Sequence, residues 1–178
     1  QVSTATGEVL LSKSFDIPAP ATPVVLSIKA DTLMFSKSAQ FTMTGYSLEK
    51  EFNVSTKNCK GLALVSGGSS TSKSVTCNVG AVGTGAVSFD AKMADGTVLK
   101  SASFDVPNPQ VSMVTNLGTL KLELNPTAAP ITVVNYLQYV NDKHYDGTIF
   151  HRVIPNFMIQ GGGYDLQYKE RATRAPVQ

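Results

Sequence analysis

The chain has 178 residues, of which 42% are apolar and 16% are charged, and its formal net charge is +2. This length suits one ordinary domain or two small ones, and the apolar content excludes a wholly disordered tail. No uninterrupted apolar run approaches the roughly 18 residues that cross a bilayer, so a membrane span is not expected. The first residues lack a basic stretch followed by an apolar one, so a signal peptide was either removed or never present.

Charge and residue types divide the chain near residue 107. Basic and acidic residues nearly balance in segments 1–19, 20–107 and 108–178, but all three Arg and five of the six Tyr lie in the last segment. None of the segments carries the basic excess that binds a phosphate backbone, so nucleic acid is not an expected partner. The boundary coincides with the sequence VPNPQ, whose two prolines are typical of a linker.

Residues 1–19 contain half of an internal repeat. The sequence GEVLLSKSFDIP at residues 7–18 returns as GTVLKSASFDVP at residues 96–107, with eight identities in twelve positions. The offset is about the size of a small sandwich domain, which favours a tandem array. Residues 1–19 are then the last strand of an upstream repeat, or an N-terminal arm, and the chain is part of a longer protein. The alternative is that two strands of one domain have similar sequences.

Residues 20–107 show the short alternation of apolar and polar residues that is typical of antiparallel strands. Apolar residues alternate in five runs: Val24, Leu26 and Ile28; Phe41 and Met43; Phe52 and Val54; Leu62 and Leu64; Val87 and Phe89. Gly, Ser, Asn and Lys-rich turns separate these runs, and no helical stripe interrupts them. The segment is therefore predicted to fold as an immunoglobulin-like β-sandwich and resembles bacterial immunoglobulin-like domains.

The two cysteines, Cys59 and Cys77, flank a Gly and Ser-rich stretch of this segment. A disulfide between them would close a loop of 19 residues, counting both ends, and would stabilise the fold by about 3 kcal/mol in the chain-entropy model. A disulfide fits an oxidising compartment, so a periplasmic or secreted protein is predicted. Two buried free thiols are the alternative. The spacing is not CxxC and neither histidine is near in sequence, which argues against a metal site.

Beyond the linker, the pattern predicts two hairpins on either side of a helix. Residues 111–126 form two strand-like runs around the turn at Asn116–Gly118. Residues 130–140 begin with Pro130, which suits the first turn of a helix, and carry apolar residues at helical spacing. Residues 149–163 form two apolar runs that are separated by ProAsn and end at three glycines.

Arg152 is unusual because it lies within an apolar strand pattern. An unpaired guanidinium that pointed into a core would be strongly unfavourable. Gln160 is a second polar residue in an apolar run, and Phe and Met lie close by. These residues could form a hydrophobic pocket with a few hydrogen-bond donors. The alternative is an Arg on an edge strand that simply points to solvent.

The stretch YDGTIFHRVIPNFMIQGGG at residues 145–163 resembles the signature of the cyclophilin-type peptidyl-prolyl isomerases. The segments TNLGTLKLEL, PITVVNYLQYV and TRAP resemble the same family in the right order. The resemblance implies that residues 108–178 form the N-terminal part of a cyclophilin-like β-barrel, with one helix.

The resemblance also implies a mechanism. The family's Arg donates a hydrogen bond to the proline nitrogen as the peptide bond loses its double-bond character, and Arg152 would take that role. Phe157 and Met158 correspond to residues that form the wall of the proline pocket, and Gln160 to one that binds the substrate backbone and orients the Arg. Proline-containing peptides or unfolded proteins are the implied substrates, and no cofactor or metal is needed.

The family's barrel is closed, whereas the resemblance covers only its first part. We therefore expect the chain as it stands to be inactive. Its open barrel edge should be covered by another chain, by an exchanged strand or by the sandwich. The leading hypothesis is a rotamase that assists the folding of exported proteins and is carried on an immunoglobulin-like module. The alternative is an adhesion or interaction protein whose half domain binds peptides without catalysis.

Overall fold

The computed structural model describes residues 2–3, 9–11 and 17–177. The described chain is mainly β, with one helix. Strand β1 (Val2–Ser3) pairs antiparallel with β2 (Val9–Leu11). Residues 7–8 and 12–16 of the predicted repeat strand lie outside the described residues.

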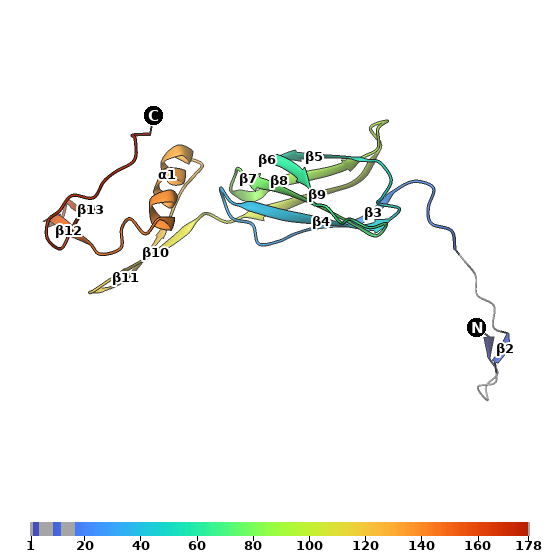
Figure 1. Cartoon of the computed structure of the whole chain (residues 1–178), viewed down its shortest axis with the longest axis horizontal. Helices are drawn as coiled ribbons and strands as arrows, with labels where there is room; N and C mark the ends of the chain where they lie inside the picture. The colour runs from blue at the N-terminus through green and yellow to red at the C-terminus, as the bar shows by residue number, and fades with distance from the viewer. Residues whose placement is uncertain (1, 4–8, 12–16, 178) are drawn as a thin grey trace.

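Residues 24–106 form two antiparallel sheets (Figure 1). The four-stranded sheet contains, in spatial order, β3 (Val24–Ala30), β4 (Ser38–Tyr46), β7 (Ser72–Val79) and β6 (Cys59–Leu64). The three-stranded sheet contains, in spatial order, β5 (Asn53–Lys57), β8 (Gly83–Lys92) and β9 (Val98–Val106). All five predicted apolar runs lie in or directly beside these strands.

A single core joins the two sheets, because buried side chains alternate with more exposed ones along β4 and most of β8. In β6 the predicted apolar run is not buried, since Leu62 and Leu64 are exposed. Phe41 of β4 and Phe89 of β8 are almost completely buried, and their ring centroids lie 4.1 Å apart. Phe104 of β9 completes the cluster, 5.4 Å from Phe41. Each fully buried Phe contributes roughly 2–3 kcal/mol relative to an exposed one, so these contacts hold the sheets together.

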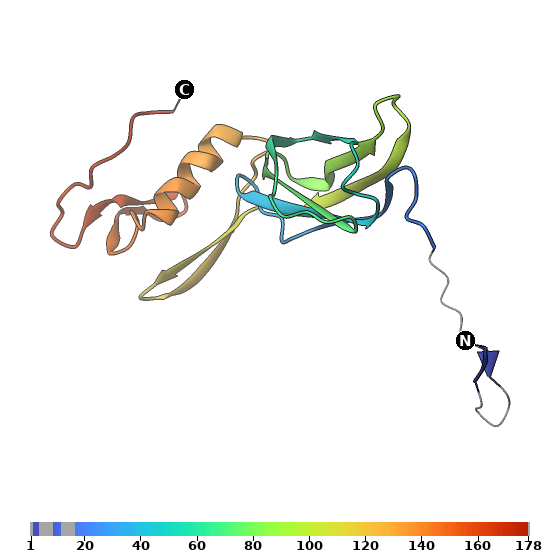
Figure 2. The ribbon, with the colours of Figure 1, turned by 45° about the vertical axis from the view of Figure 1, so that its right-hand side comes forward.

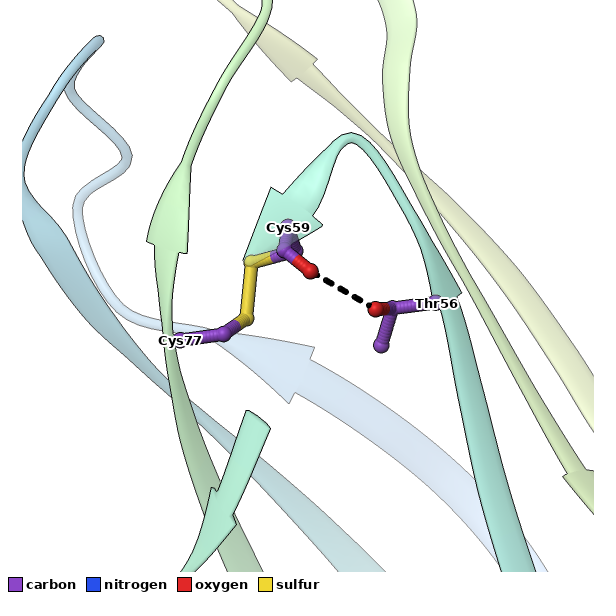
Figure 3. The surroundings of a disulfide bond; sticks show 3 residues. All are labelled: Thr56, Cys59 and Cys77. Atoms are coloured by element: carbon purple, nitrogen blue, oxygen red, sulfur yellow. Dashed lines mark hydrogen bonds between the residues drawn. A yellow bond between two sulfur atoms is a disulfide. The ribbon is translucent and has the colours of Figure 1, made fainter. Parts of the chain in front are cut away.

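The predicted disulfide is present between Cys59 and Cys77 (Figure 3). It joins the neighbouring strands β6 and β7 within one sheet, with the two Cα atoms 5.5 Å apart. Both cysteines are buried, and the Thr56 hydroxyl donates a 3.0 Å hydrogen bond to the carbonyl oxygen of Cys59. The prediction of a bonded pair is confirmed, and the alternative of free thiols is wrong.

Residues 110–177 lie at one end of the sandwich and form two hairpins and a helix (Figures 1 and 2). The first hairpin consists of β10 (Gln110–Thr115) and β11 (Gly118–Glu123), and the second of β12 (Thr148–Ile154) and β13 (Met158–Asp165). The hairpins belong to separate two-stranded sheets. No closed barrel forms within the described residues, because no strand between the hairpins connects their edges.

Helix α1 (Pro130–Asn141) begins at Pro130, as the sequence predicts. Proline suits this position because its missing N–H would have no partner in the first turn. Val133 is the buried residue of the helix. Within residues 17–177, no helix is long and apolar enough to cross a membrane.

Candidate functional site

The hairpin β12–β13 brings together the residues that the sequence singled out. Arg152 lies directly opposite Gln160, and Ile154 lies opposite Met158. Residues that are opposite each other, and residues two apart on one strand, share a face of a sheet. Arg152, Met158 and Gln160 therefore lie on one face of the hairpin. The turn at its end is closed by the N–H of Phe157, which donates to the carbonyl oxygen of Ile154 over 3.1 Å.

This face is open to solvent. Arg152 and Gln160 are exposed, Met158 is half-buried, and 76% of the Phe157 surface is accessible. Among the described residues, β12 and β13 form a two-stranded sheet, and β13 is otherwise joined only by an isolated bridge between Tyr164 and Glu170. No further strand of the described chain lies beside Arg152. The predicted residues lie near one another, but the enclosed proline pocket is absent from residues 17–177. Here Arg152 has the exposure expected of an edge-strand residue.

The three arginines of the chain have different surroundings. The Arg174 guanidinium donates to Gln138 of α1 over 2.7 Å and forms an ion pair with Asp142, the residue that follows α1. The Arg171 side chain donates to the carbonyl oxygen of Asp146 over 2.7 Å. By contrast, the guanidinium of Arg152 makes no hydrogen bond or ion pair with the described part of the chain. Its five donors are free to bind a ligand.

Arg174 of the C-terminal segment makes further contacts with α1 besides its ion pair with Asp142. The backbone N–H of Arg174 donates to the Tyr139 hydroxyl over 2.6 Å, and its guanidinium lies 5.5 Å from the centre of the Tyr139 ring. Tyr136 of the helix also packs against Tyr145 with tilted rings, whose centroids lie 5.4 Å apart. Partial burial raises the pKa of both Tyr136 and Tyr145. The concentration of tyrosines in this segment was visible in the sequence, but their partners were not.

The glycine run continues β13 instead of ending it, so the predicted strand end is wrong. β13 extends to Asp165, through residues 161–163. A Cβ on Gly161 would lie 2.7 Å from Cδ1 of Phe150, and one on Gly162 would lie 2.9 Å from the Tyr145 ring. Gly162 also has a φ of +89°, which favours glycine. The glycines therefore allow two aromatic rings to lie against the strand.

His151 is adjacent to Arg152 in β12, and its ring packs edge-on against Tyr164, with centroids 4.8 Å apart. The Nδ1 atom of His151 is buried and has no hydrogen-bond partner among the described residues. Nothing in its surroundings indicates a metal ligand set, since residues 17–177 contain no group of three or more His, Cys, Asp or Glu side chains arranged for one.

A hollow lies elsewhere, between α1 and the end of the sandwich. It has a volume of about 480 Å³ and is lined by Phe35, Lys60, Val79, Ile131 and Val134, among others. A second, smaller hollow lies at the linker, around residues 83–84 and 105–108. Neither contains Arg152. If cavities alone were considered, the candidate site would lie between the two parts of the chain. The polar side chains of Arg152 and Gln160 favour the β12–β13 hairpin instead.

Comparison with known proteins finds a family match for this part of the chain. Residues 110–177 match the family of cyclophilin type peptidyl-prolyl cis-trans isomerases/CLD. This matched range is called the cyclophilin-type segment. All four predicted site residues, Arg152, Phe157, Met158 and Gln160, lie within the matched range.

Named relatives share this cyclophilin-type segment at high identity. A peptidyl-prolyl cis-trans isomerase of Acinetobacter baylyi is 56% identical over 70 residues, which is 39% of this chain and 37% of the relative. The isomerase cyp18 of Streptomyces antibioticus is 54% identical over 68 residues, 38% of this chain and 41% of the relative. Isomerase B of Escherichia coli is 45% identical over 67 residues, with the same two shares. The chain thus spans about two fifths of the length of these relatives.

Proposed function

We propose that the protein is a peptidyl-prolyl cis-trans isomerase whose cyclophilin-type segment supplies the catalytic Arg152. The observation that carries this proposal is the match of residues 110–177 to isomerases, with Arg152 unpaired and opposite Gln160 on one hairpin face. An exposed guanidinium with free donors is suited to a ligand that has hydrogen-bond acceptors.

The proposed chemistry requires no covalent step. Rotation about a peptide bond faces a barrier of about 18–20 kcal/mol. The guanidinium of Arg152 donates to the proline nitrogen as that atom becomes pyramidal, which stabilises the transition state more than the planar ground state. Gln160 binds the substrate backbone and orients Arg152, while Phe157 and Met158 form the apolar wall for the proline ring.

The open face of the hairpin leads to a second part of the proposal. A guanidinium acts most strongly in a site from which water is excluded, and Arg152 and Phe157 are exposed in this chain. We therefore expect residues 1–178 alone to be inactive. The open edges of both hairpins would be covered by further strands of the domain, by a second chain or by the sandwich.

The test measures the cis-trans exchange of a proline peptide with this chain and with a protein that contains the whole cyclophilin-type domain. The longer protein should be active and this chain inactive. In the longer protein, Arg152→Ala should reduce kcat/KM by about 100-fold or more. Arg152→Lys should restore little activity, since it keeps the charge but not the planar donor fork. Lys169→Ala, at an exposed position of the same segment, is the matched control. Full activity of the Arg152→Ala protein would refute the assignment.

We further propose that residues 20–107 are an immunoglobulin-like carrier module and that residues 108–178 belong to the isomerase domain. The sheet order β3-β4-β7-β6 and β5-β8-β9 supports this, since immunoglobulin constant-type domains have the corresponding four-and-three arrangement. The disulfide differs from theirs because it lies within one sheet. On the tandem interpretation, residues 1–19 end a preceding module.

The Cys59–Cys77 disulfide supports a periplasmic or secreted location, where the protein would assist the folding of exported proteins. Thiol alkylation of the protein in intact cells tests this proposal. Both cysteines should resist alkylation unless a reductant is added first. Prompt alkylation of both cysteines without a reductant would contradict it.

The exposure of Phe157 and Arg152 favours one alternative: an adhesion or interaction protein whose cyclophilin-type segment binds peptides without catalysis. Peptide titration followed by NMR separates the two functions. The isomerase proposal expects Arg152→Ala in the longer protein to abolish turnover while peptide affinity falls only severalfold. Peptide binding without turnover in the unmodified longer protein would support the alternative.

A further inference from the structure

One short motif in the sandwich has no part in the proposed isomerase function. Residues 53–55 have the sequence Asn-Val-Ser, which is an acceptor sequence for N-linked glycans because the middle residue is not proline. The sequence contains one other Asn-X-Ser/Thr, at residues 125–127, and there proline in the middle excludes it. Bacterial oligosaccharyltransferases also recognise an acidic residue two positions before the asparagine, and Glu51 occupies that position.

The structure places this motif on an edge of the sandwich. Asn53 is the first residue of β5, which pairs with β8 and forms one edge of its sheet. Asn53 and Ser55 are both exposed, and they share the outer face of the strand because they are two residues apart. Val54 between them packs against the core, and Glu51 is exposed in the loop that precedes β5. The fold thus presents all the polar residues of the motif to solvent.

The side-chain amide of Asn53 makes no hydrogen bond with the described part of the chain. Lys92, which lies opposite Asn53 on β8, instead forms an ion pair with Asp90 over 3.1 Å. By contrast, Asn58, directly after β5, donates its amide N–H to the carbonyl oxygen of Ala86 over 2.8 Å. The amide nitrogen of Asn53 is therefore free to react without breaking a contact of the fold.

The motif lies at the end of the sandwich that is farther from the cyclophilin-type segment. The loop before β5 contacts the start of the sandwich, where the Lys50 ammonium donates to the carbonyl oxygen of Pro20 over 2.8 Å. Beyond the other end of β5, Lys60 lines the hollow beside α1. Five residues of strand, about 17 Å in length, separate the two ends of β5. A group attached to Asn53 would therefore leave the β12–β13 hairpin uncovered.

We propose that Asn53 is an acceptor site for an N-linked glycan, which an oligosaccharyltransferase transfers from a lipid-linked oligosaccharide. The amide nitrogen forms a bond to the anomeric carbon of the first sugar, and the bond from that carbon to the pyrophosphate oxygen breaks. The lipid pyrophosphate leaves with the bonding electrons, and one amide proton passes to a base of the transferase. Because this transfer takes place outside the cytoplasm, the inference rests on the proposed location. The glycan would also hinder pairing of the β5 edge with other chains.

Transfer to the folded chain tests this proposal. The full chain, with its disulfide intact, is incubated with a purified bacterial oligosaccharyltransferase and a lipid-linked oligosaccharide. Its intact mass should increase by one glycan, and peptide mapping should find that glycan on Asn53. Asn53→Gln should abolish the increase, and Ser55→Ala should reduce transfer by about ten-fold or more. Asn78→Gln is the matched control and should change nothing, because Asn78 is also an exposed strand residue followed by valine but has glycine at the third position.

Two further measurements separate the motif from the stability of the fold. The urea midpoints of these variants should match that of the unmodified chain, because each altered side chain is exposed. Glu51→Gln should reduce transfer severalfold without changing the midpoint. Transfer to the reduced, unfolded chain alone would overturn the proposal, as would a glycan that persists in the Asn53→Gln protein. None of these readouts depends on isomerase activity or on the location of the protein, so this inference fails or holds independently of both proposals.

Discussion

The sandwich and the cyclophilin-type segment use the same period-two pattern with different results. In the sandwich, the pattern leaves Phe41 with no accessible surface. In the second hairpin of the segment, Val153 and Ile159 of the strands are 61% and 57% accessible, and Phe157 of the turn is 76% accessible. The difference lies in the partners. Each sheet of the sandwich faces another sheet within the chain, whereas neither hairpin pairs with a further strand among the described residues. Alternation thus specifies which face should be buried, and a second layer must be present to bury it.

The largest expected effect concerns the two phenylalanines of this comparison. Phe41→Ala should lower the free energy of unfolding of the sandwich by about 3–5 kcal/mol, because it leaves a cavity in a packed core. Phe157→Ala should change the free energy of unfolding of the chain by less than about 0.5 kcal/mol. Urea denaturation followed by circular dichroism measures both. A large loss of stability from Phe157→Ala would mean that the hairpin face is covered.

The disulfide gives the next largest effect, again confined to the sandwich. Replacing both Cys59 and Cys77 by Ala should reduce stability by about 3 kcal/mol, since the unfolded chain regains the freedom of a closed loop. The urea midpoint of the unmodified chain should fall similarly when reductant is added, and that of the double variant should not move. A reductant effect in the double variant would point to another cause.

A smaller effect is expected within the segment itself. Gly162→Ala forces a side chain into a φ of +89° and against the Tyr145 ring, so it should destabilise β13 by about 1–2 kcal/mol. Gly163→Ala is the matched control, because a Cβ there meets no atom within 4 Å. Amide hydrogen exchange of β13 should accelerate in the first variant only. Equal exchange rates would contradict the contact with Tyr145.

The smallest effect is a pH dependence of the sandwich. A hydrogen bond from Ser101, together with Lys92, lowers the pKa of Asp90 below its usual value of 3.8. A carboxylate with a lowered folded-state pKa stabilises the fold above its unfolded pKa, and this contribution is lost as the pH falls through the folded value. Asp90→Asn should therefore lessen the loss of thermal stability on going from pH 5 to pH 2. An unchanged acid dependence would show that Asp90 contributes nothing.

Local patterns predicted most of the elements. Pro107 and Pro109 predicted the linker, Pro130 predicted the start of the helix, and the alternating runs and the ProAsn turn predicted the strands. Each of these features depends on residues that are near in sequence. The surroundings of Arg152 could not be predicted in this way. They depend on what packs against the hairpin, which alternation along one strand does not contain. The glycine run was misjudged for the same reason, since Phe150 and Tyr145 approach it from other elements.

The hydrogen bonds and the ion pair between Arg174 and the end of α1 could not be predicted from the sequence, although each of these residues is visible in it. Gln138, Tyr139 and Asp142 lie within one turn of the helix and its end, and Arg174 follows more than thirty residues later. A hydrogen bond across such a separation follows only from the path of the chain between the two ends.

The connection between the two parts is very short. Strand β9 ends at Val106 and β10 begins at Gln110, so three residues, two of them proline, separate them. Three extended residues reach at most about 11 Å, and proline removes one backbone rotation at each of its positions. The linker therefore limits how far the first hairpin can move from this end of the sandwich. A polypeptide bound at that end would stay close to the first hairpin in any relative orientation of the two parts.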